Sequence, residues 1–208
     1  MARIKIGNVR TPIDYLKQFF APAGFGLGLS DGEWVSSPDD IAKNGFYRSV
    51  APGVAPGVAW YVCICYSDDH KTVIGFKEDS GGVAFMRTMK TGVWGEWEFA
   101  NPPMNIDMEY RTTERFKGKP VYRKIVAYNL PTSTNTDFTV PHGISDFDTL
   151  VRQTASVGAG VPLPYTHNGN TTCVKELDAT NIKVSNSGQS WDTSYTWNFY
   201  LYYTKTTD

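Results

Sequence analysis

Hydrophobic and polar side chains alternate along most of the second half of this chain, a period of two residues that is typical of β-strands. The clearest case is residues 195–204, which place two rows of side chains on opposite faces of one strand. One row is almost wholly hydrophobic and consists of Tyr195, Trp197, Phe199, Leu201 and Tyr203. Further strand patterns occur at 121–128, 138–140, 149–157, 172–176 and 181–184. Short strands at this spacing, separated by turn-rich segments, predict an antiparallel β-sandwich or barrel, of which we expect the sandwich.

A short helix followed by an antiparallel meander is predicted for the first half. Ser37 is a suitable N-cap, Pro38 suits the first helical position, and Asp39 and Asp40 favour the first turn. The dipeptide at 44–45, Asn-Gly, should end this helix. Strand patterns follow at 59–66, 72–77 and 83–89, with turn residues between them, and the meander closes near 94–99.

A second amphipathic helix is predicted near the start of the chain. Pro12 marks its first turn, and Ile13, Leu16 and Phe20 form an apolar stripe at helical spacing. A helix of about two turns is marginal in water by itself. It must therefore pack either on its own domain or on another subunit or a larger assembly, and the sequence leaves both open.

The best domain boundary lies at residues 101–103, Asn-Pro-Pro, because consecutive prolines cannot donate to a sheet and favour an extended spacer. We expect an N-terminal segment at 1–26, a small α+β domain at 27–101 and a β-sandwich at 104–208. The predicted fold class is therefore mainly β, with a short N-terminal helix.

Charge and hydropathy exclude several classes of protein. The 208 residues carry 20 Lys and Arg against 21 Asp and Glu, a formal net charge of −1. Nucleic-acid binding depends on a surplus of basic residues, so no nucleic-acid partner is expected. The sequence contains no apolar run of the roughly 20 residues that cross a bilayer, and no signal peptide follows Met1. We expect neither membrane insertion nor secretion by that route.

The cysteines and histidines do not form a recognisable metal motif. Cys63 and Cys65 lie two apart, so on a strand they point the same way and make poor disulfide partners, and Cys173 is distant. His70 is near the first pair, but a fourth ligand at metal-site spacing is missing. We expect buried thiols in a protein folded in a reducing cytoplasm, without metal or cofactor.

Candidate catalytic groups are sparse. The sequence has no phosphate loop, zinc-protease helix or nucleophile elbow. His142 lies in a turn, where fixation by the neighbouring backbone is favoured over a role as a general base. Asp146 and Asp148 have the spacing to share one face of an extended segment, which would suit a cation or glycoside hydrolysis. Without further ligands or a nucleophile, we expect no enzyme.

Aromatic residues carry the strongest functional indication. Tyr200 and Tyr202 lie opposite the hydrophobic row of the last strand, and Trp191 and Tyr165 are expected near its ends. Exposed Tyr and Trp rings stack on the apolar faces of sugars and anchor protein interfaces. We predict a ligand-binding role for these four residues. The alternative is that both strand faces are buried, one by the sandwich core and one by a neighbouring subunit.

The order of several motifs resembles the pyocin-knob type of domain found in phage tail fibres and related bacteriocin fibres. The residues that carry the resemblance are the helix start at 38–41, the Asn-Gly-Phe-Tyr turn at 44–47, the strand at 60–66 and Trp94-Gly95-Glu96-Trp97. The lead-in at 21–28 resembles the segment before knobs in fibre proteins. The second half, 110–208, resembles a β-rich C-terminal module of tail-associated proteins.

This resemblance implies a non-enzymatic virion fibre or receptor-binding protein, made in the host cytoplasm and located in the virion. It implies a homotrimer that binds a host cell-surface glycan. The N-terminal segment, with Ile13, Leu16 and Phe20, would then attach to other virion proteins. Two alternatives remain open at this point. One is a purely structural capsid or baseplate decoration, such as a head fibre, and the other is a surface-polysaccharide depolymerase that uses Asp146 or Asp148.

Overall fold

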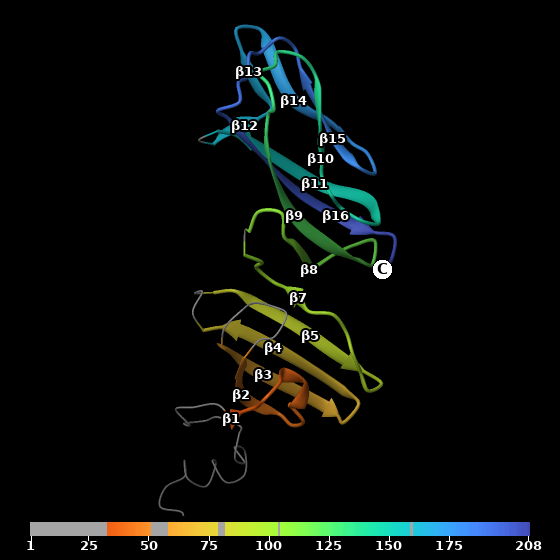
Figure 1. Ribbon diagram of the computed structural model, residues 1–208. Coiled ribbons are helices and arrows are strands. Elements are labelled where there is room, and N and C mark those ends of the chain that lie inside the picture. The colour runs from red at the N-terminus through yellow and green to blue at the C-terminus, as the bar shows by residue number, and fades with distance from the viewer. Residues whose placement is uncertain (1–32, 51–57, 79–81, 104, 159) are drawn as a thin grey trace, which may run out of the picture. The chain divides into compact units, whose positions relative to one another are not determined.

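The computed structural model describes residues 33–50, 58–78, 82–103, 105–158 and 160–208, and these are mainly β-strand. The chain divides into two compact units, Met1–Asn101 and Pro102–Asp208 (Figure 1). The predicted N-terminal segment 1–26, its helix and its stripe of Ile13, Leu16 and Phe20 lie outside the described residues.

The first unit is built on one sheet in the order β1-β2-β3-β4-β5-β7. Neighbouring strands are antiparallel, except that β1 runs parallel to β2. The short strand β6 lies outside this order and pairs antiparallel with β5. The strand bounds are β1 Glu33–Trp34, β2 Gly45–Val50, β3 Val58–Ser67, β4 His70–Lys77, β5 Ala84–Lys90, β6 Val93–Trp94 and β7 Glu98–Phe99. The predicted antiparallel meander corresponds to β3, β4 and β5.

The helix predicted from Ser37 is a single 3₁₀ turn, η1, at Pro38–Asp40. Its start is as expected, because the Ser37 hydroxyl accepts from the Asp39 N–H at 3.2 Å and the Asp40 carboxylate accepts from the Ser37 N–H at 3.0 Å. Its predicted length is wrong. Ile41 is extended and fully buried, so packing ends the helix one turn after it begins. The expected α+β domain is therefore a β-sheet with one short turn of helix.

One face of the first sheet is the core of its unit. Tyr61, Val73 and Phe85 are 0–1% exposed on this face, and the Phe85 ring makes an edge contact with Trp97 at 5.2 Å between centroids. Gly75 faces the same core. A side chain there would place its Cβ 2.4 Å from the Phe85 ring, so the aromatic packing requires glycine.

The second unit is an antiparallel β-sandwich, as predicted. One sheet has the order β8-β9-β16-β11-β12 and the other β10-β15-β14-β13. The first sheet contains β8 Glu109–Phe116, β9 Lys119–Asn129, β16 Thr196–Lys205, β11 Phe147–Val157 and β12 Val161–Leu163. The second contains β10 Phe138–Pro141, β15 Asn181–Asn186, β14 Asn170–Leu177 and β13 Tyr165–His167.

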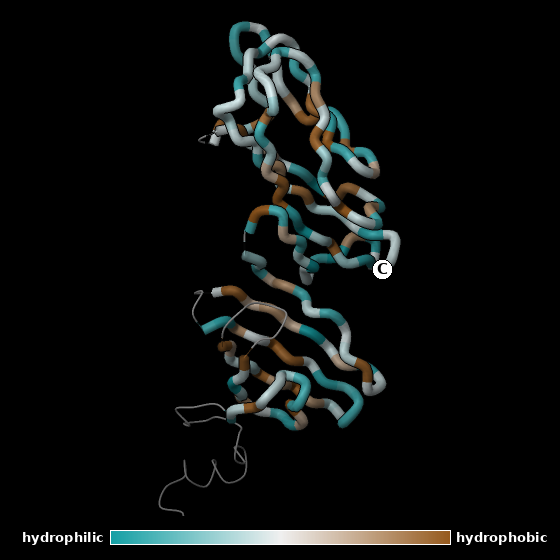
Figure 2. The backbone as a smooth tube through the Cα atoms, viewed as in Figure 1, coloured by the Kyte–Doolittle hydropathy of each residue, from teal (hydrophilic) through white to brown (hydrophobic). Residues whose placement is uncertain are grey.

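The two sheets of this sandwich share one hydrophobic core. Hydrophobic and hydrophilic positions follow one another along its strands in Figure 2. The buried cluster contains residues of both sheets, among them Val126, Phe199, Val140 and Ile182. Trp197 lies near the centre, fully buried, with edge contacts to Phe138 at 5.0 Å and Trp191 at 5.2 Å between ring centroids. Such contacts between aromatic rings stabilise a core beyond the area they bury.

Candidate functional site

The last strand, β16, lies inside its sheet and has two different faces. It pairs with β9 on one side and β11 on the other, so its backbone is hydrogen-bonded along both edges. Its inner row, from Trp197 to Tyr203, is completely buried in the sandwich core. Its outer row carries Tyr200 and Tyr202, both half-buried. The hydrophobic row thus serves the fold, and the outer row reaches the surface in part.

Tyr202 is held between two arginines from the neighbouring strands. Arg123 on β9 and Arg152 on β11 are both in register with Tyr202. Their guanidinium carbons lie 5.1 Å and 3.8 Å from the centre of the phenol ring. A guanidinium over an aromatic face is attracted by the negative charge of the ring face. The ring is therefore braced from both sides and is only partly exposed to solvent.

A carboxylate completes the support of this ring. Arg152 donates to both oxygens of Glu114, at 3.1 and 3.4 Å. Both side chains of this ion pair are about half exposed, so the pair contributes little to stability. Its effect is to restrain the orientation of the guanidinium that stacks on Tyr202.

Tyr200 extends the same face along β16. It lies two residues from Tyr202, so both rings project to the same side of the sheet. Its partner on β11 is Thr154, which is exposed, and its partner on β9 is the buried Ile125. We call Tyr200, Tyr202, Arg123, Arg152 and Thr154 the tyrosine face. It combines two aromatic rings with guanidinium donors and a hydroxyl.

The other two predicted ligand residues lie elsewhere in the unit. Trp191 is 5% exposed, and its indole N–H donates to the Thr172 hydroxyl at 3.0 Å. It fills the core and offers no ring to a ligand from outside. Tyr165 on β13 is half-buried, makes an edge contact with Trp191 at 5.7 Å and stacks on His167 at 6.2 Å. The structure brings together Tyr200 and Tyr202, and separately Trp191 and Tyr165.

Sequence reasoning did not find Arg123, Arg152 and Glu114. Each stands beside at least one other polar residue in an ordinary strand segment, so nothing in the local pattern distinguishes them. Their significance comes from the register between β9, β16 and β11, which joins residues far apart in the sequence.

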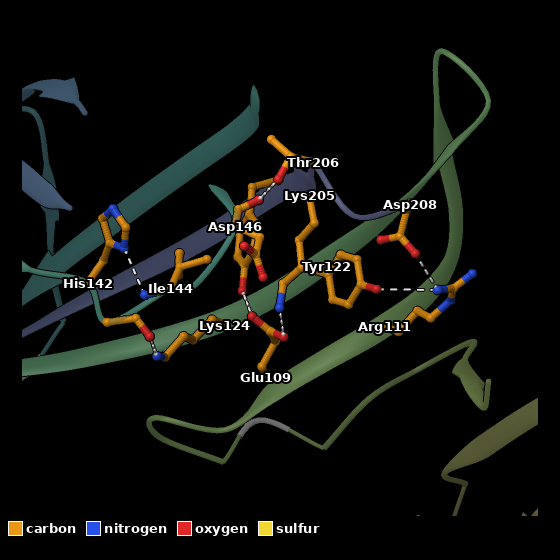
Figure 3. Close-up of polar contacts among 12 residues, drawn as sticks. Glu109, Arg111, Tyr122, Lys124, His142, Ile144, Asp146, Lys205, Thr206 and Asp208 are labelled. Carbon is orange, nitrogen blue, oxygen red and sulfur yellow. Dashed lines mark hydrogen bonds and ion pairs between the residues drawn. The ribbon is translucent and has the colours of Figure 1, made fainter. Parts of the chain in front are cut away.

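His142 is a structural histidine, as expected for a turn. Its Nδ1 accepts from the Ile144 N–H at 3.0 Å (Figure 3), and its Nε2 lies 3.1 Å from the Asp178 carbonyl oxygen. The side chain is almost completely buried. Both ring nitrogens are therefore engaged by the backbone.

Asp146 and Asp148 do not share one face of an extended segment. Asp146 has a positive φ of 57°, which turns the chain before β11. The Asp148 carboxylate contacts Lys119 at 2.8 Å and Thr204 at 3.2 Å. The hydrogen bond from Lys119 lowers the pKa of Asp148 from its usual value. Asp148 thus ties β11 to its neighbours as a carboxylate.

A polar network fastens the end of the chain to β8 and β9. The Glu109 carboxylate accepts from the Tyr203 hydroxyl. It also accepts from Lys205, as Figure 3 shows. Arg111 donates to Asp208 at 2.7 Å and to the Tyr122 hydroxyl at 3.3 Å. Burial is the largest cause that raises the pKa of Tyr203, and the bond to Glu109 comes next. These contacts hold β16 in the register that forms the tyrosine face.

The residues that the structure describes hold neither a metal-ion cluster nor a membrane-spanning helix. Among those that the structure describes, no group of three or more His, Cys, Asp or Glu side chains is placed to hold a metal ion. Within the same ranges, no helix is long and apolar enough to cross a membrane. Burial raises the pKa of the Cys63 thiol to about 11, and Cys63, Cys65 and Cys173 are free thiols.

Comparisons with known proteins give only distant structural matches. No family model and no curated protein matches the sequence. An N-truncated R2-type pyocin tail fibre aligns with 85% of this chain and 99% of its own, at 9% identity and a TM-score of 0.31. The R1 and R2 pyocin fibres of P. aeruginosa each align over 86% of this chain and 68% of theirs, at 10% and 9% identity and the same TM-score of 0.31. At these values the likeness carries no argument about function.

Proposed function

We propose that this chain is a virion fibre protein of the tail-fibre type, non-enzymatic and homotrimeric, that binds a host-surface glycan through the tyrosine face. The order of motifs that resembles fibre knobs supports the assignment to fibres. One observation carries the proposed binding site: the Tyr202 ring is partly exposed and braced by the guanidinium of Arg152 at 3.8 Å. In this proposal the N-terminal segment attaches the chain to other virion proteins.

The chemistry of the tyrosine face suits a sugar. The C–H faces of a pyranose pack on an aromatic ring, a role that Tyr200 can take because the guanidinium groups of Arg123 and Arg152 cover the ring of Tyr202. The sugar's hydroxyl groups accept hydrogen bonds from guanidinium donors. Tyr202 is already restrained by Arg123 and Arg152, so binding would order few additional rotamers. A flat face of this kind binds weakly per site, and several copies on one particle would raise the avidity.

The test uses the full chain and the intact host cell. Tyr202→Ala and Tyr200→Ala should each weaken binding to cells or to purified surface glycan by roughly tenfold, as expected for a ring that anchors an interface. The matched control is Tyr195→Ala, because Tyr195 is 39% exposed in the same unit but lies outside the tyrosine face. Unchanged binding by both variants, with unchanged melting temperatures, would reject the proposed site.

The non-enzymatic part of the proposal has its own test. Asp148 is held by Lys119 and Thr204, which supports a structural role for this carboxylate. Incubation with host surface polysaccharide should release no reducing ends. Release that disappears in Asp146→Asn or Asp148→Asn would instead favour the depolymerase. Electron microscopy of labelled particles distinguishes a tail position from a capsid or baseplate decoration.

A further inference from the structure

A pocket lies at one edge of the sandwich and has a volume of about 220 Å³. It is lined by residues 153–155 of β11, by Cys173 and Val174 of β14, and by Leu163 and Pro164, where the chain passes from β12 to β13. Figure 1 shows β12, β13 and β14 together at one end of the second unit. Because β11 and β14 belong to different sheets, the pocket lies between the two layers of the sandwich.

Gln153 lines this pocket with an amide that has no partner. The residue is in register with the buried Leu201 and lies two positions from the buried Ala155, so its side chain is on the inner side of the sheet. Its Oε1 atom is buried, and no group of the described residues forms a hydrogen bond with the amide. Buried polar groups are nearly always paired, because an unpaired one loses its hydration without compensation. The amide is therefore a free recognition group, and rotation about its last side-chain bond can turn its oxygen or its nitrogen toward the pocket.

The surroundings of this amide are neutral and mostly hydrophobic. Ala155 belongs to the sandwich core, and Leu163 and Val174 pack against that core while they remain half-buried. All the described residues that line the pocket are uncharged. A charged ligand would lose its hydration here without gaining a counter-ion, so the pocket favours a neutral one.

Volume and lining together select the ligand. At about 30 Å³ per molecule in liquid water, the pocket holds about seven water molecules, which is enough for one substituent and part of a sugar ring. An acetamido group carries an N–H, a carbonyl oxygen and a methyl group. Its amide can exchange hydrogen bonds with the amide of Gln153, and its methyl group can pack on Leu163 and Val174. A hydroxyl group in the same place would bring no apolar atoms to these side chains.

We propose that this pocket binds the acetamido group of an N-acetylated sugar, which Gln153 recognises through its amide. The inference rests on the proposed glycan binding and names the class of sugar. Thr154 lines the pocket and also belongs to the tyrosine face, where it pairs with Tyr200. The pairing between β11 and β12 covers residues 155–157, which leaves Gln153 and Thr154 at an open edge of β11 within the described part of the chain. One oligosaccharide can therefore reach both the pocket and the ring of Tyr200.

The test titrates the full chain with N-acetylglucosamine and with glucose, which differ in the acetamido group. Saturation-transfer NMR should place the acetamido methyl protons closest to the protein, and glucose should bind about tenfold more weakly because it leaves the amide of Gln153 unpaired. Gln153→Met keeps the length of the side chain without its amide. It should weaken binding of N-acetylglucosamine about tenfold and should melt no lower than wild type, because a buried unpaired group is removed.

The matched control is Gln189→Met. Gln189 is also half-buried in the second unit but does not line the pocket, so this variant should bind N-acetylglucosamine as wild type does. Equal binding of the two sugars by wild type, or no binding of either, would overturn the inference. So would a folded Gln153→Met variant with wild-type affinity. If Gln153→Met does not fold, Leu163→Ala should weaken binding about threefold through the lost methyl contact, and an unchanged affinity would have the same consequence.

Failure of the pocket and failure of the tyrosine face give different results. If Tyr200→Ala and Tyr202→Ala bind cells as wild type does while Gln153→Met loses N-acetylglucosamine, the tyrosine face is rejected and the pocket stands. If the tyrosine variants lose cell binding while Gln153→Met keeps its affinity for N-acetylglucosamine, the pocket alone is rejected.

Discussion

The guanidinium carbon of Arg87 lies 4.4 Å from the ring centre of Trp97. Trp94 covers the same guanidinium at 4.5 Å, and the Asp39 carboxylate forms an ion pair with it. The two tryptophans of the Trp94-Gly95-Glu96-Trp97 motif therefore enclose one arginine. Burial is the largest cause that lowers the pKa of Arg87. The motif closes the core of the first unit around this cation.

Replacement of Arg87 should destabilise the first unit. Arg87→Met should lower the free energy of unfolding by about 1–3 kcal/mol, because cation–π contacts of a desolvated guanidinium contribute about that much. Arg152→Met is the control, since Arg152 stacks on Tyr202 but its side chain is 54% exposed. Urea unfolding followed by tryptophan fluorescence measures both. Equal small losses in the two variants would contradict the proposed role of the enclosed arginine.

Gly75→Ala should also destabilise the first unit. The new Cβ would lie 2.4 Å from the Phe85 ring and 2.9 Å from the Tyr61 ring, so both rings must move. Overpacking of this kind costs about 1–3 kcal/mol. Calorimetry should show a lower melting temperature. In the Phe85→Leu background the added methyl should cost less, and an equal cost in both backgrounds would show that the clash with Phe85 is not the cause.

Trp191→Ala should unfold or strongly weaken the sandwich. Trp191 is a core residue that also satisfies the Thr172 hydroxyl. Loss of a buried tryptophan costs about 3–5 kcal/mol. The expected result is a large drop in melting temperature. The melting temperature of Trp191→Phe should lie between those of wild type and Trp191→Ala. A Trp191→Ala variant with native melting and reduced glycan binding would restore Trp191 to the list of ligand residues.

Alkaline pH should weaken the sandwich through its buried tyrosines. Burial raises the pKa of Tyr122 to about 12 and that of Tyr203 further, from an ordinary value of 10.0. The folded chain therefore favours the neutral phenols. The stabilisation that the neutral phenols give the folded chain is complete below pH 10. It is lost as the pH rises toward 12. Melting temperatures between pH 8 and 12 should fall steeply in wild type and less in Tyr203→Phe. If the melting temperatures of wild type and Tyr203→Phe fell equally with pH, ionisation of Tyr203 would not be the cause.

Some features could be predicted from the sequence because their causes are local. The alternation of residues 195–204 predicts a strand with one hydrophobic face, and the structure confirms that Trp197, Phe199, Leu201 and Tyr203 are buried. The Ser37 cap also forms as predicted. Side-chain alternation and hydrogen bonds between residues two or three apart are local features. They can be predicted without knowing which distant segments pack nearby.

Features that depend on distant partners could not be predicted. The helix after Ser37 ends early because Ile41 is required in the core. Trp191 looks like an exposed ring in the sequence, yet the second sheet covers it. The tyrosine face exists because β9, β16 and β11 bring Arg123 and Arg152 into register with Tyr202.

The amino-acid sequence thus determined the β-rich class, the faces of individual strands and the first residues of the 3₁₀ turn. The tertiary structure alone decided which aromatic rings are buried and which remain at the surface. The physical reason is that a two-residue period orients side chains within one strand, whereas burial depends on which other strands pack against it. Those pairings join residues dozens of positions apart, and no local pattern encodes them.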